Sequence, residues 1–148
     1  MNISLQYLPL PPTDNKLRRG SWKNRGGYKS LEYRAFETEI EIWYHRNIGI
    51  IKEMQIKIKP NQLYFIEVFL YLSKEKILKK DGNPKIKSND CANFNKAAHD
   101  AISKILQVDD AMFNDQRTNR RITKESFEYM DVFLKEMDLS SLEDAPQA

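Results

Sequence analysis

The chain has 148 residues, of which 41% are hydrophobic and 30% charged, and its formal net charge is +3. This length is typical of one domain with one modest core, so a wholly disordered chain is not expected. No segment has the roughly 20 apolar residues of a transmembrane helix, and the first residues lack the pattern of a signal peptide. The single cysteine, Cys91, excludes a disulfide framework and a Cys-rich zinc site. We expect a reduced, cytoplasmic protein.

The charges are unevenly distributed along the chain. Residues 1–35 carry seven Lys and Arg against two acids, a balance of +5, whereas residues 122–148 carry two Lys against seven acids, a balance of −5. A second basic cluster at residues 74–87 holds six lysines against two acids. The basic clusters favour a polyanionic partner, although a solvated surface with an acidic tail explains the charges equally well.

In chain order, the first expected element is a strand over Ile3–Leu8, because apolar and polar residues alternate there until Pro9. Three glycines, Asp14, Asn15 and five basic residues predict a loop over residues 13–27. Ser30 is placed to cap a helix from about Leu31 to Ile48, with Gly49 as its closing residue.

The middle of the chain begins with Met54, Ile56 and Ile58, which alternate with polar residues. Gln62–Leu72 is apolar and rich in β-branched and aromatic residues, which predicts a central strand. The following segment, Lys74–Lys87, contains the turn signal Asp-Gly-Asn-Pro and is expected to form a mobile hairpin or loop.

Asn93–Leu106 is the clearest helix, because its apolar residues recur at helical spacing and form one stripe. The other face is polar and carries Asn95, Lys96, His99, Asp100, Ser103 and Lys104. Residues 112–121 are polar and ambiguous, whereas the alternation over Phe127–Met137 favours a strand.

We therefore expect a single α+β domain over residues 1–138, followed by an acidic, disordered tail at residues 139–148. In this domain a small mixed sheet of about four strands packs on one side against two helices. The apolar stripes of the two helices supply the core.

Few residues suggest chemistry by themselves. The chain has no phosphate-binding glycine loop, dinucleotide fingerprint or HExxH or GxSxG motif. His45 and His99 have no partner at a metal-ligand spacing, so each is expected to be a surface or half-buried helix residue. Cys91 precedes a helix, but no histidine follows it at a place that suggests thiol catalysis.

The carboxylates are more informative. Asp90 precedes the second helix and the pair Asp109-Asp110 follows it, and a helix of about 14 residues is roughly 21 Å long. The carboxylates can share a metal only if the segment with Asp90 folds back along the helix. From the residues alone we favour the alternative, in which Asp90 caps the helix and the pair forms a turn.

Two blocks of the sequence resemble the RusA-type Holliday-junction resolvases, which are small phage-derived endonucleases. LPLPPTDNKL at residues 8–17, with YKSLEYRAF at 28–36, is similar to the family's opening strand, Pro-Pro-x-x-Asn turn and basic loop. NDCANFNKAAHDAISKILQVDDAMF at residues 89–113 is similar to the signature D-x-D-N-x-x-K-x-x-x-D-A-L followed by D-D-x-Q, and this block is fairly specific. The match spans roughly residues 4–115.

The resemblance implies a metal-dependent nuclease site. It assigns Asp90 as the first motif aspartate, Lys96 as the motif lysine, and Asp110 in preference to Asp109 as the third catalytic carboxylate. The implied metal is Mg²⁺, with Mn²⁺ as a substitute, held by Asp90, Asp109 and Asp110.

The resemblance also implies the partners. A homodimer would bind a four-way DNA junction and make paired symmetric incisions, without a membrane or a small-molecule cofactor. The residues expected to contact DNA are Asn15, Lys16, Arg18, Arg19, Lys23, Arg25, Lys85, Lys87 and Lys96.

Two positions depart from the family pattern. Ala92 occupies the place of the second motif aspartate, and Met112 that of the glutamine. Because alanine supplies no oxygen ligand, this chain is expected to be catalytically impaired unless the site is built differently, with Asp109 or Asp100. The alanine would otherwise be a substitution made to trap a complex or reduce toxicity, or a natural loss of activity.

Three functions compete at this point. The first is a metal-dependent endonuclease that resolves four-way junctions. The second is a non-catalytic junction-binding protein on the same fold, which Ala92 favours. The third is a small phage interaction protein with no role in nucleic-acid binding, which would show no salt-dependent retention on a junction.

Overall fold

The structure, a computed structural model, describes residues 2–13, 18–19, 28–85 and 94–143. It confirms the α+β class. The elements, in chain order, are β1 (Asn2–Pro9), β2 (Arg18–Arg19), β3 (Tyr28–Lys29), α1 (Leu31–Arg46), α2 (Ile48–Lys57), β4 (Tyr64–Leu72), α3 (Lys74–Ile77), α4 (Asn95–Leu106), η4 (Asp110–Met112), β5 (Phe113–Ile122), β6 (Tyr129–Glu136) and η5 (Leu139–Glu143).

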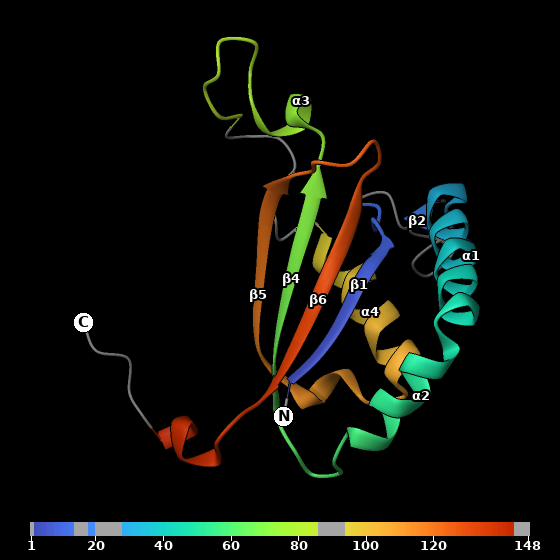
Figure 1. Ribbon diagram of the computed structural model, residues 1–148, viewed down its shortest axis with the longest axis vertical. Coiled ribbons are helices and arrows are strands. Elements are labelled where there is room, and N and C mark those ends of the chain that lie inside the picture. Colours follow the sequence, from blue (N-terminus) through green and yellow to red (C-terminus); the bar gives the residue numbers. More distant parts are fainter. Residues whose placement is uncertain (1, 14–17, 20–27, 86–93, 144–148) are drawn as a thin grey trace.

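A four-stranded mixed sheet in the order β1-β6-β4-β5 forms the centre of the molecule, and β2 and β3 form a separate two-stranded sheet. β4 pairs antiparallel with β6 and parallel with β5, so it is a central strand as predicted. Parallel neighbours need a crossover, and α4 lies in the connection from β4 to β5. Helices α1, α2 and α4 all lie on one side of the sheet (Figure 1).

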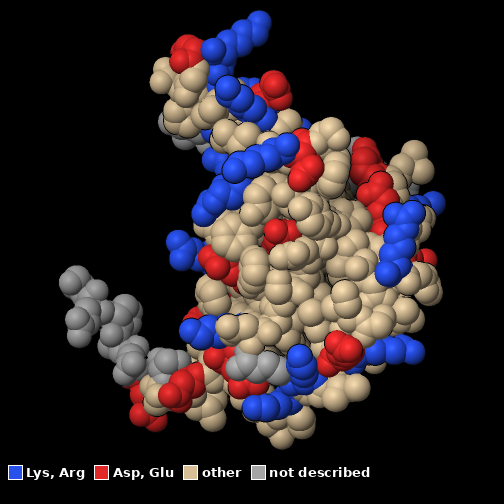
Figure 2. Space-filling model, viewed as in Figure 1, with Lys and Arg blue, Asp and Glu red and all other residues tan. Residues whose placement is uncertain are grey.

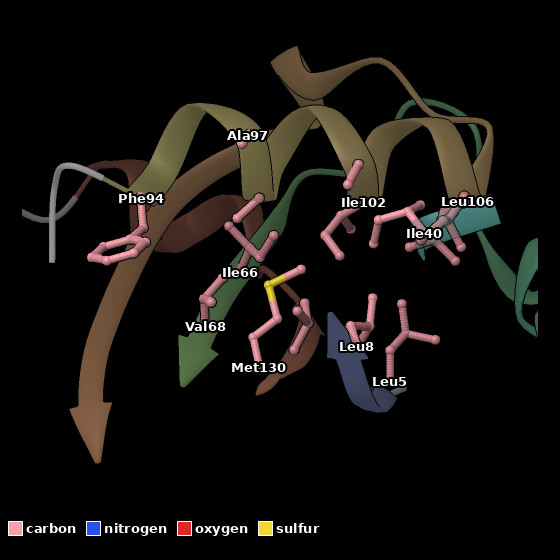
Figure 3. Packing of buried hydrophobic residues seen from close by; sticks show 14 of the residues in the cluster. Leu5, Leu8, Ile40, Ile66, Val68, Phe94, Ala97, Ile102, Leu106 and Met130 are labelled. Atoms are coloured by element: carbon pink, nitrogen blue, oxygen red, sulfur yellow. The ribbon is translucent and has the colours of Figure 1, made fainter. Parts of the chain in front are cut away.

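The core fills the space between the sheet and these helices. Along β4 every second residue is buried, and Ile66 and Val68 point toward the apolar stripe of α4 (Figure 3). That stripe includes Ala97, Ile102 and Leu106, each at most 1% exposed. The alternation of the strands and the helical spacing of α4 thus place one apolar set of side chains in a common core.

The expected first helix is divided into two. Ser30 caps α1 as predicted, since its hydroxyl accepts a hydrogen bond from the Tyr33 N–H at 3.0 Å. The end predicted at Gly49 is wrong, because α1 ends at Arg46 and Gly49 lies inside α2. The side-chain amide of Asn47 donates to the Trp43 carbonyl at 2.8 Å, which satisfies a terminal carbonyl and ends α1 earlier.

The alternation of Met54, Ile56 and Ile58 does not correspond to a strand. Met54 and Ile56 lie in α2, and Ile58 is its C-terminal cap. Ile56 is 84% exposed, so the apolar residues of this segment are not all on one buried face.

The segment after β4 projects from the end of the sheet as a hairpin, which we define as residues 74–85 (Figure 1). It consists of α3, a bridge between Leu78 and Pro84, and a turn at Gly82, whose φ of +88° is one that glycine adopts readily. The hairpin expected from the sequence is confirmed over these residues.

The polar segment that the sequence left ambiguous is the edge strand β5. The strand predicted near the C-terminus is β6, in which Met130, Val132 and Leu134 are buried. His99 is more buried than the surface or half-buried position that we expected, because it is only 8% exposed and packs against the Phe113 ring at 6.2 Å between centroids.

Candidate nucleic-acid interface

The first turn of α4 is fixed on the edge strand β5. The Thr118 hydroxyl donates a hydrogen bond to the Asn95 side-chain oxygen at 2.5 Å. One residue further along the helix, the exposed Lys96 lies on the polar face. The start of the helix, and with it the motif lysine, therefore has a defined position against the middle of β5.

Arg120 extends the same region. Side chains two residues apart on a strand point to the same face, so Arg120 shares the face of Thr118 and lies about 7 Å further along β5. β5 begins near the C-terminal end of α4, after η4, and passes the start of the helix at Thr118. Arg120, further along the strand, therefore lies beyond the start of α4. The sequence analysis missed Arg120, although the alternation of Thr118 and Arg120 within FNDQRTNRRI could have indicated it.

The hairpin of residues 74–85 adds lysines at the end of the sheet where β4 and β5 finish. Lys79 and Lys80 are exposed, and Lys/Arg side chains gather over this part of the molecule (Figure 2). The Lys85 ammonium donates to the Glu75 carbonyl at 2.5 Å. Lys85 is thus part of the folded hairpin and remains on the basic surface that the sequence predicted.

Glu128 fastens this hairpin to the sheet. One carboxylate oxygen accepts from the Lys76 ammonium at 2.6 Å, and the other accepts from the Ser73 N–H at 2.8 Å. Burial raises the pKa of Glu128, but these hydrogen bonds and the Lys76 charge outweigh it, so the pKa lies below its ordinary 4.5. The ionised form is therefore the one that holds the hairpin.

Asp109 and Asp110 lie beyond the opposite end of α4. The helix has 12 residues and is about 18 Å long, so these carboxylates are separated from Lys96 by most of that length. The Asp109 side chain accepts a hydrogen bond from the Ala111 N–H at 2.9 Å and caps the short helix η4. Asp110 is exposed and occupies the first position of η4.

The carboxyl pair therefore forms a turn, as one interpretation of the sequence anticipated. Across residues 2–13, 18–19, 28–85 and 94–143, no three acidic, histidine or cysteine side chains are close enough to hold a metal ion. Asp90 precedes Phe94 by four residues and can lie at most about 14 Å from it.

Several predicted site residues lie outside the part of the chain that the structure describes. They are Asn15, Lys16, Lys23, Arg25, Lys87, Asp90 and Ala92. Arg18 and Arg19 form β2, whose backbone pairs with that of Lys29 and Tyr28 in β3. This pairing brings the basic segment next to the start of α1, which follows β3 directly.

A groove of about 440 Å³ lies between α1 and α4. Its floor is apolar, with Phe36 and Ile40 from α1 facing Ala101 of α4. Asp100, which corresponds to the helix aspartate of the family signature, lies on this groove. It is one helical turn after Lys96 and so shares that helix face.

The comparisons with known proteins define the class. The family model described as Endodeoxyribonuclease RusA matches residues 9–127, which is most of the chain. This protein belongs to the RusA endodeoxyribonuclease family, and membership implies a nuclease that resolves Holliday junctions. No curated protein matches the chain closely. None of the helices in the described ranges is long and apolar enough to cross a membrane.

Proposed function

We propose that this protein is a metal-dependent endonuclease that binds four-way DNA junctions as a homodimer and cuts two opposed strands symmetrically. The observation that carries the proposal is the position of Lys96, exposed on the first turn of α4 and next to a basic stretch of β5. The signature segment that contains Asp90 leads directly into this helix.

The basic surface supplies the contacts to the DNA backbone. Lys96 and Arg120 on one side, and the hairpin lysines Lys79, Lys80 and Lys85 on the other, offer cationic groups along one end of the sheet. Phosphate contacts of this kind position a protein on DNA independently of sequence. The basic segment around Arg18 and Arg19 would extend this surface.

The expected metal fits the chemistry of the available donors. Asp109 and Asp110 offer carboxylate oxygens, which Mg²⁺ and Mn²⁺ prefer, and Asp90 would supply the remaining carboxylate. A bound Mg²⁺ lowers the pKa of a coordinated water and offsets negative charge on a phosphate. Lys96, near the other end of α4, would contact a backbone phosphate of the bound DNA away from these carboxylates.

The decisive experiment concerns position 92. Ala92→Asp is expected to create or increase Mg²⁺-dependent cleavage of a mobile four-way junction, because it adds an anionic oxygen ligand at the motif position. The matched control Ala92→Asn has the same size without the charge and is expected to cleave poorly or not at all. Symmetric nicks near the crossover, resolved on denaturing gels, provide the readout.

Inactivity of Ala92→Asp in a folded protein that binds the junction would contradict the catalytic assignment. Full activity of the chain with Ala92 would instead show that other carboxylates, Asp109 first among them, hold the metal.

A non-catalytic junction-binding protein is the second candidate, and Ala92 favours it. Its binding would fall steeply with salt, since each neutralised phosphate releases counterions. The two candidates share this behaviour and differ only in whether Ala92→Asp produces cleavage.

A further inference from the structure

The groove between α1 and α4 has a regular apolar floor. The two helices lie side by side on the covered side of the sheet (Figure 1). Phe36, Ile40 and Tyr44 of α1 line the floor together with Ala97 and Ala101 of α4. On each helix these residues recur four positions apart, so each set forms a continuous stripe along its helix. The groove therefore follows the helices for several turns.

The hydrophobic core is thinly covered along this groove. Ile66 and Ile102 in the middle of the core are completely buried, whereas Ile40 and Ala101 on the groove floor keep 6% and 8% of their surface exposed. Tyr44 packs against the core and is only partly buried. The groove has a volume of about 440 Å³, which lies in the range of preformed ligand sites. Apolar side chains of a ligand can therefore reach the floor.

The polar residues that line the groove carry mostly negative charge. The carboxylates of Glu37, Glu41 and Asp100 stand against one ammonium group, that of Lys104, and the imidazole of His45. Glu37 is already paired with a lysine of β3 at 2.9 Å. Glu41 and Asp100 are exposed, and neither forms an ion pair within the part of the chain that the structure describes. These two carboxylates are therefore available to cationic groups of a ligand.

The sign of this charge distinguishes the groove from the surface that is expected to contact DNA. The chain has a net charge of +3, and the exposed lysines of the hairpin and Arg120 of β5 lie outside the groove. A phosphate backbone in the groove would be repelled by Glu41 and Asp100. A cationic partner would instead be attracted by them, and the attraction would also speed its association.

The length of the groove indicates the shape of that partner. Its lining residues extend from Tyr33 to His45 on α1, which is about 18 Å along the helix axis, and from Ala97 to Gln107 on α4, which is about 15 Å. A helix of about ten to twelve residues has the same length. Its side chains at i, i+4 and i+7 repeat the spacing of the floor residues. An amphipathic helix thus matches the groove in both length and period.

The small residues of α4 make room for such a helix. Ala97 and Ala101 end in methyl groups, whereas Phe36 and Tyr44 on the α1 side of the groove are aromatic. The distance between packed helices depends on the size of the side chains at the contact, so the two alanines allow a close approach. Leucine or methionine side chains of the partner are then expected to pack over Ala101 and against the Phe36 ring.

We propose that the groove between α1 and α4 binds a basic, amphipathic helix of another protein. The apolar side chains of that helix lie on the floor, and its Lys or Arg side chains pair with Glu41 and Asp100. This inference goes beyond the proposed nuclease activity and does not depend on it. A partner bound in the groove would leave the lysines of the hairpin and Arg120 open to DNA.

Binding of a model peptide to the full chain tests the proposal. The probe is a fluorescein-labelled peptide of about 14 residues, with leucines at i, i+4, i+7 and i+11, lysines on both sides of them and alanines elsewhere. Fluorescence anisotropy is expected to give a Kd on the order of 10 µM at low salt. One control peptide has glutamate in place of every lysine, and another has serine in place of every leucine. Each is expected to bind at least about tenfold more weakly.

Charge reversals locate the bound peptide. Glu41→Lys and Asp100→Lys are each expected to weaken its binding by about fivefold or more, since each replaces a partner of the peptide lysines with a repelling charge. The matched control is Glu39→Lys, the same change at an exposed residue of α1 that does not line the groove. It is expected to leave the Kd unchanged. Amide chemical shifts of the labelled chain are expected to change along α1 and α4, and circular dichroism confirms that each variant is folded.

Four results would overturn the proposal. The first is no binding of the lysine and leucine peptide at about 1 mM chain, or equal binding of either control peptide. The second is an equal loss of affinity in Glu39→Lys, which would show attraction to the whole chain and no defined site. The third is a set of shift changes confined to β5 or the hairpin. The fourth is a peptide that dissociates an oligomer of the chain, which would assign the groove to a second copy. None of these results bears on cleavage by Ala92→Asp.

Discussion

The two faces of the main sheet come from alternate residues of the same strands, yet their side chains differ in kind. In β4 the helix-covered positions are mostly aliphatic, such as Val68 and Leu70, and are fully buried. The intervening positions are Glu67, Phe69 and Tyr71, which are partly exposed. Both sets of residues recur at every second position, so the alternation alone does not distinguish the face that the helices cover from the face that stays uncovered.

The difference lies in what each kind of side chain can do. Aliphatic side chains interlock in a dry core, and their burial stabilises the monomer. Aromatic side chains combine a large apolar area with few rotamers, which suits a surface that is exposed in one state and covered in another. One pair of opposite charges also lies on the uncovered face: the Glu67 carboxylate lies 3.6 Å from the Arg117 guanidinium and accepts a hydrogen bond from the Asn119 amide at 3.1 Å.

The largest expected effect separates the two faces at neighbouring residues. Leu70→Ala removes a fully buried side chain and is expected to reduce the free energy of unfolding by about 2–5 kcal/mol. Tyr71→Ala, one residue along, removes mainly its stack on Tyr129 and is expected to cost about 0.5–1.5 kcal/mol in the monomer. Urea unfolding at protein concentrations low enough to keep the chain monomeric compares them. Equal losses would show that the uncovered face is part of the core.

A smaller effect concerns Glu128, which anchors the hairpin to the end of the sheet. Its pKa is lowered in the folded protein, so the ionised carboxylate contributes stability above the ordinary pKa of 4.5. Glu128→Gln is expected to lower stability at pH 7 by about 1 kcal/mol, and the difference should vanish as pH falls through the folded-state pKa. Thermal unfolding between pH 3 and pH 7 measures it, and a pH-independent difference would contradict the assignment.

The smallest expected effect has the opposite sign. Burial raises the pKa of Asp131 on the uncovered face, and the hydrogen bond from the Tyr7 N–H only partly offsets it. The folded protein therefore favours the protonated form of Asp131. The stability that this form contributes is present below pH 3.8 and is lost as the pH rises through the folded-state pKa. Asp131→Asn keeps an acceptor for Tyr7 and is expected to add about a few tenths of a kcal/mol at pH 7. No gain there, or one that persists at pH 3, would contradict this explanation.

Much of the fold was predictable because the apolar residues that recur with helical or strand period are the same residues that are buried in the core. The stripe of α4 and the β-branched, aromatic run of β4 identified these elements before any contact was known, and the Ser30 cap marked the start of α1. In β6 the alternation also separated buried Met130 from exposed Phe133. In each case one periodic property decides both the local structure and the buried face.

Other elements were not predictable because their structure depends on distant partners. β5 is polar along its length, and it is a strand because it pairs with β4, 50 residues earlier in the chain. His99 lies on the polar side of its helix by periodicity, but Phe113 covers it. The division of α1 from α2 depends on the Asn47 amide, which a pattern of apolar residues does not reveal.

The candidate site shows the same limit. The signature residues predicted the RusA endodeoxyribonuclease family, which the family model confirms, and they predict Lys96 and Asp110 as functional positions. The sequence cannot show that Lys96 and Asp110 lie near opposite ends of α4, a helix about 18 Å long. It also cannot show that Arg120 shares a strand face with Thr118 near the start of that helix.

By itself, then, the sequence determined the class of the protein, the period of its main strands and helices, and the residue types expected at its site. Only the tertiary structure decided which sheet face is covered and which end of α4 carries each of the predicted functional residues. The physical reason is the separation along the chain of the residues that interact. Secondary structure and motifs arise from interactions between residues a few positions apart. Which of two similar sheet faces is covered depends on contacts between distant segments, which form only when the whole chain has folded.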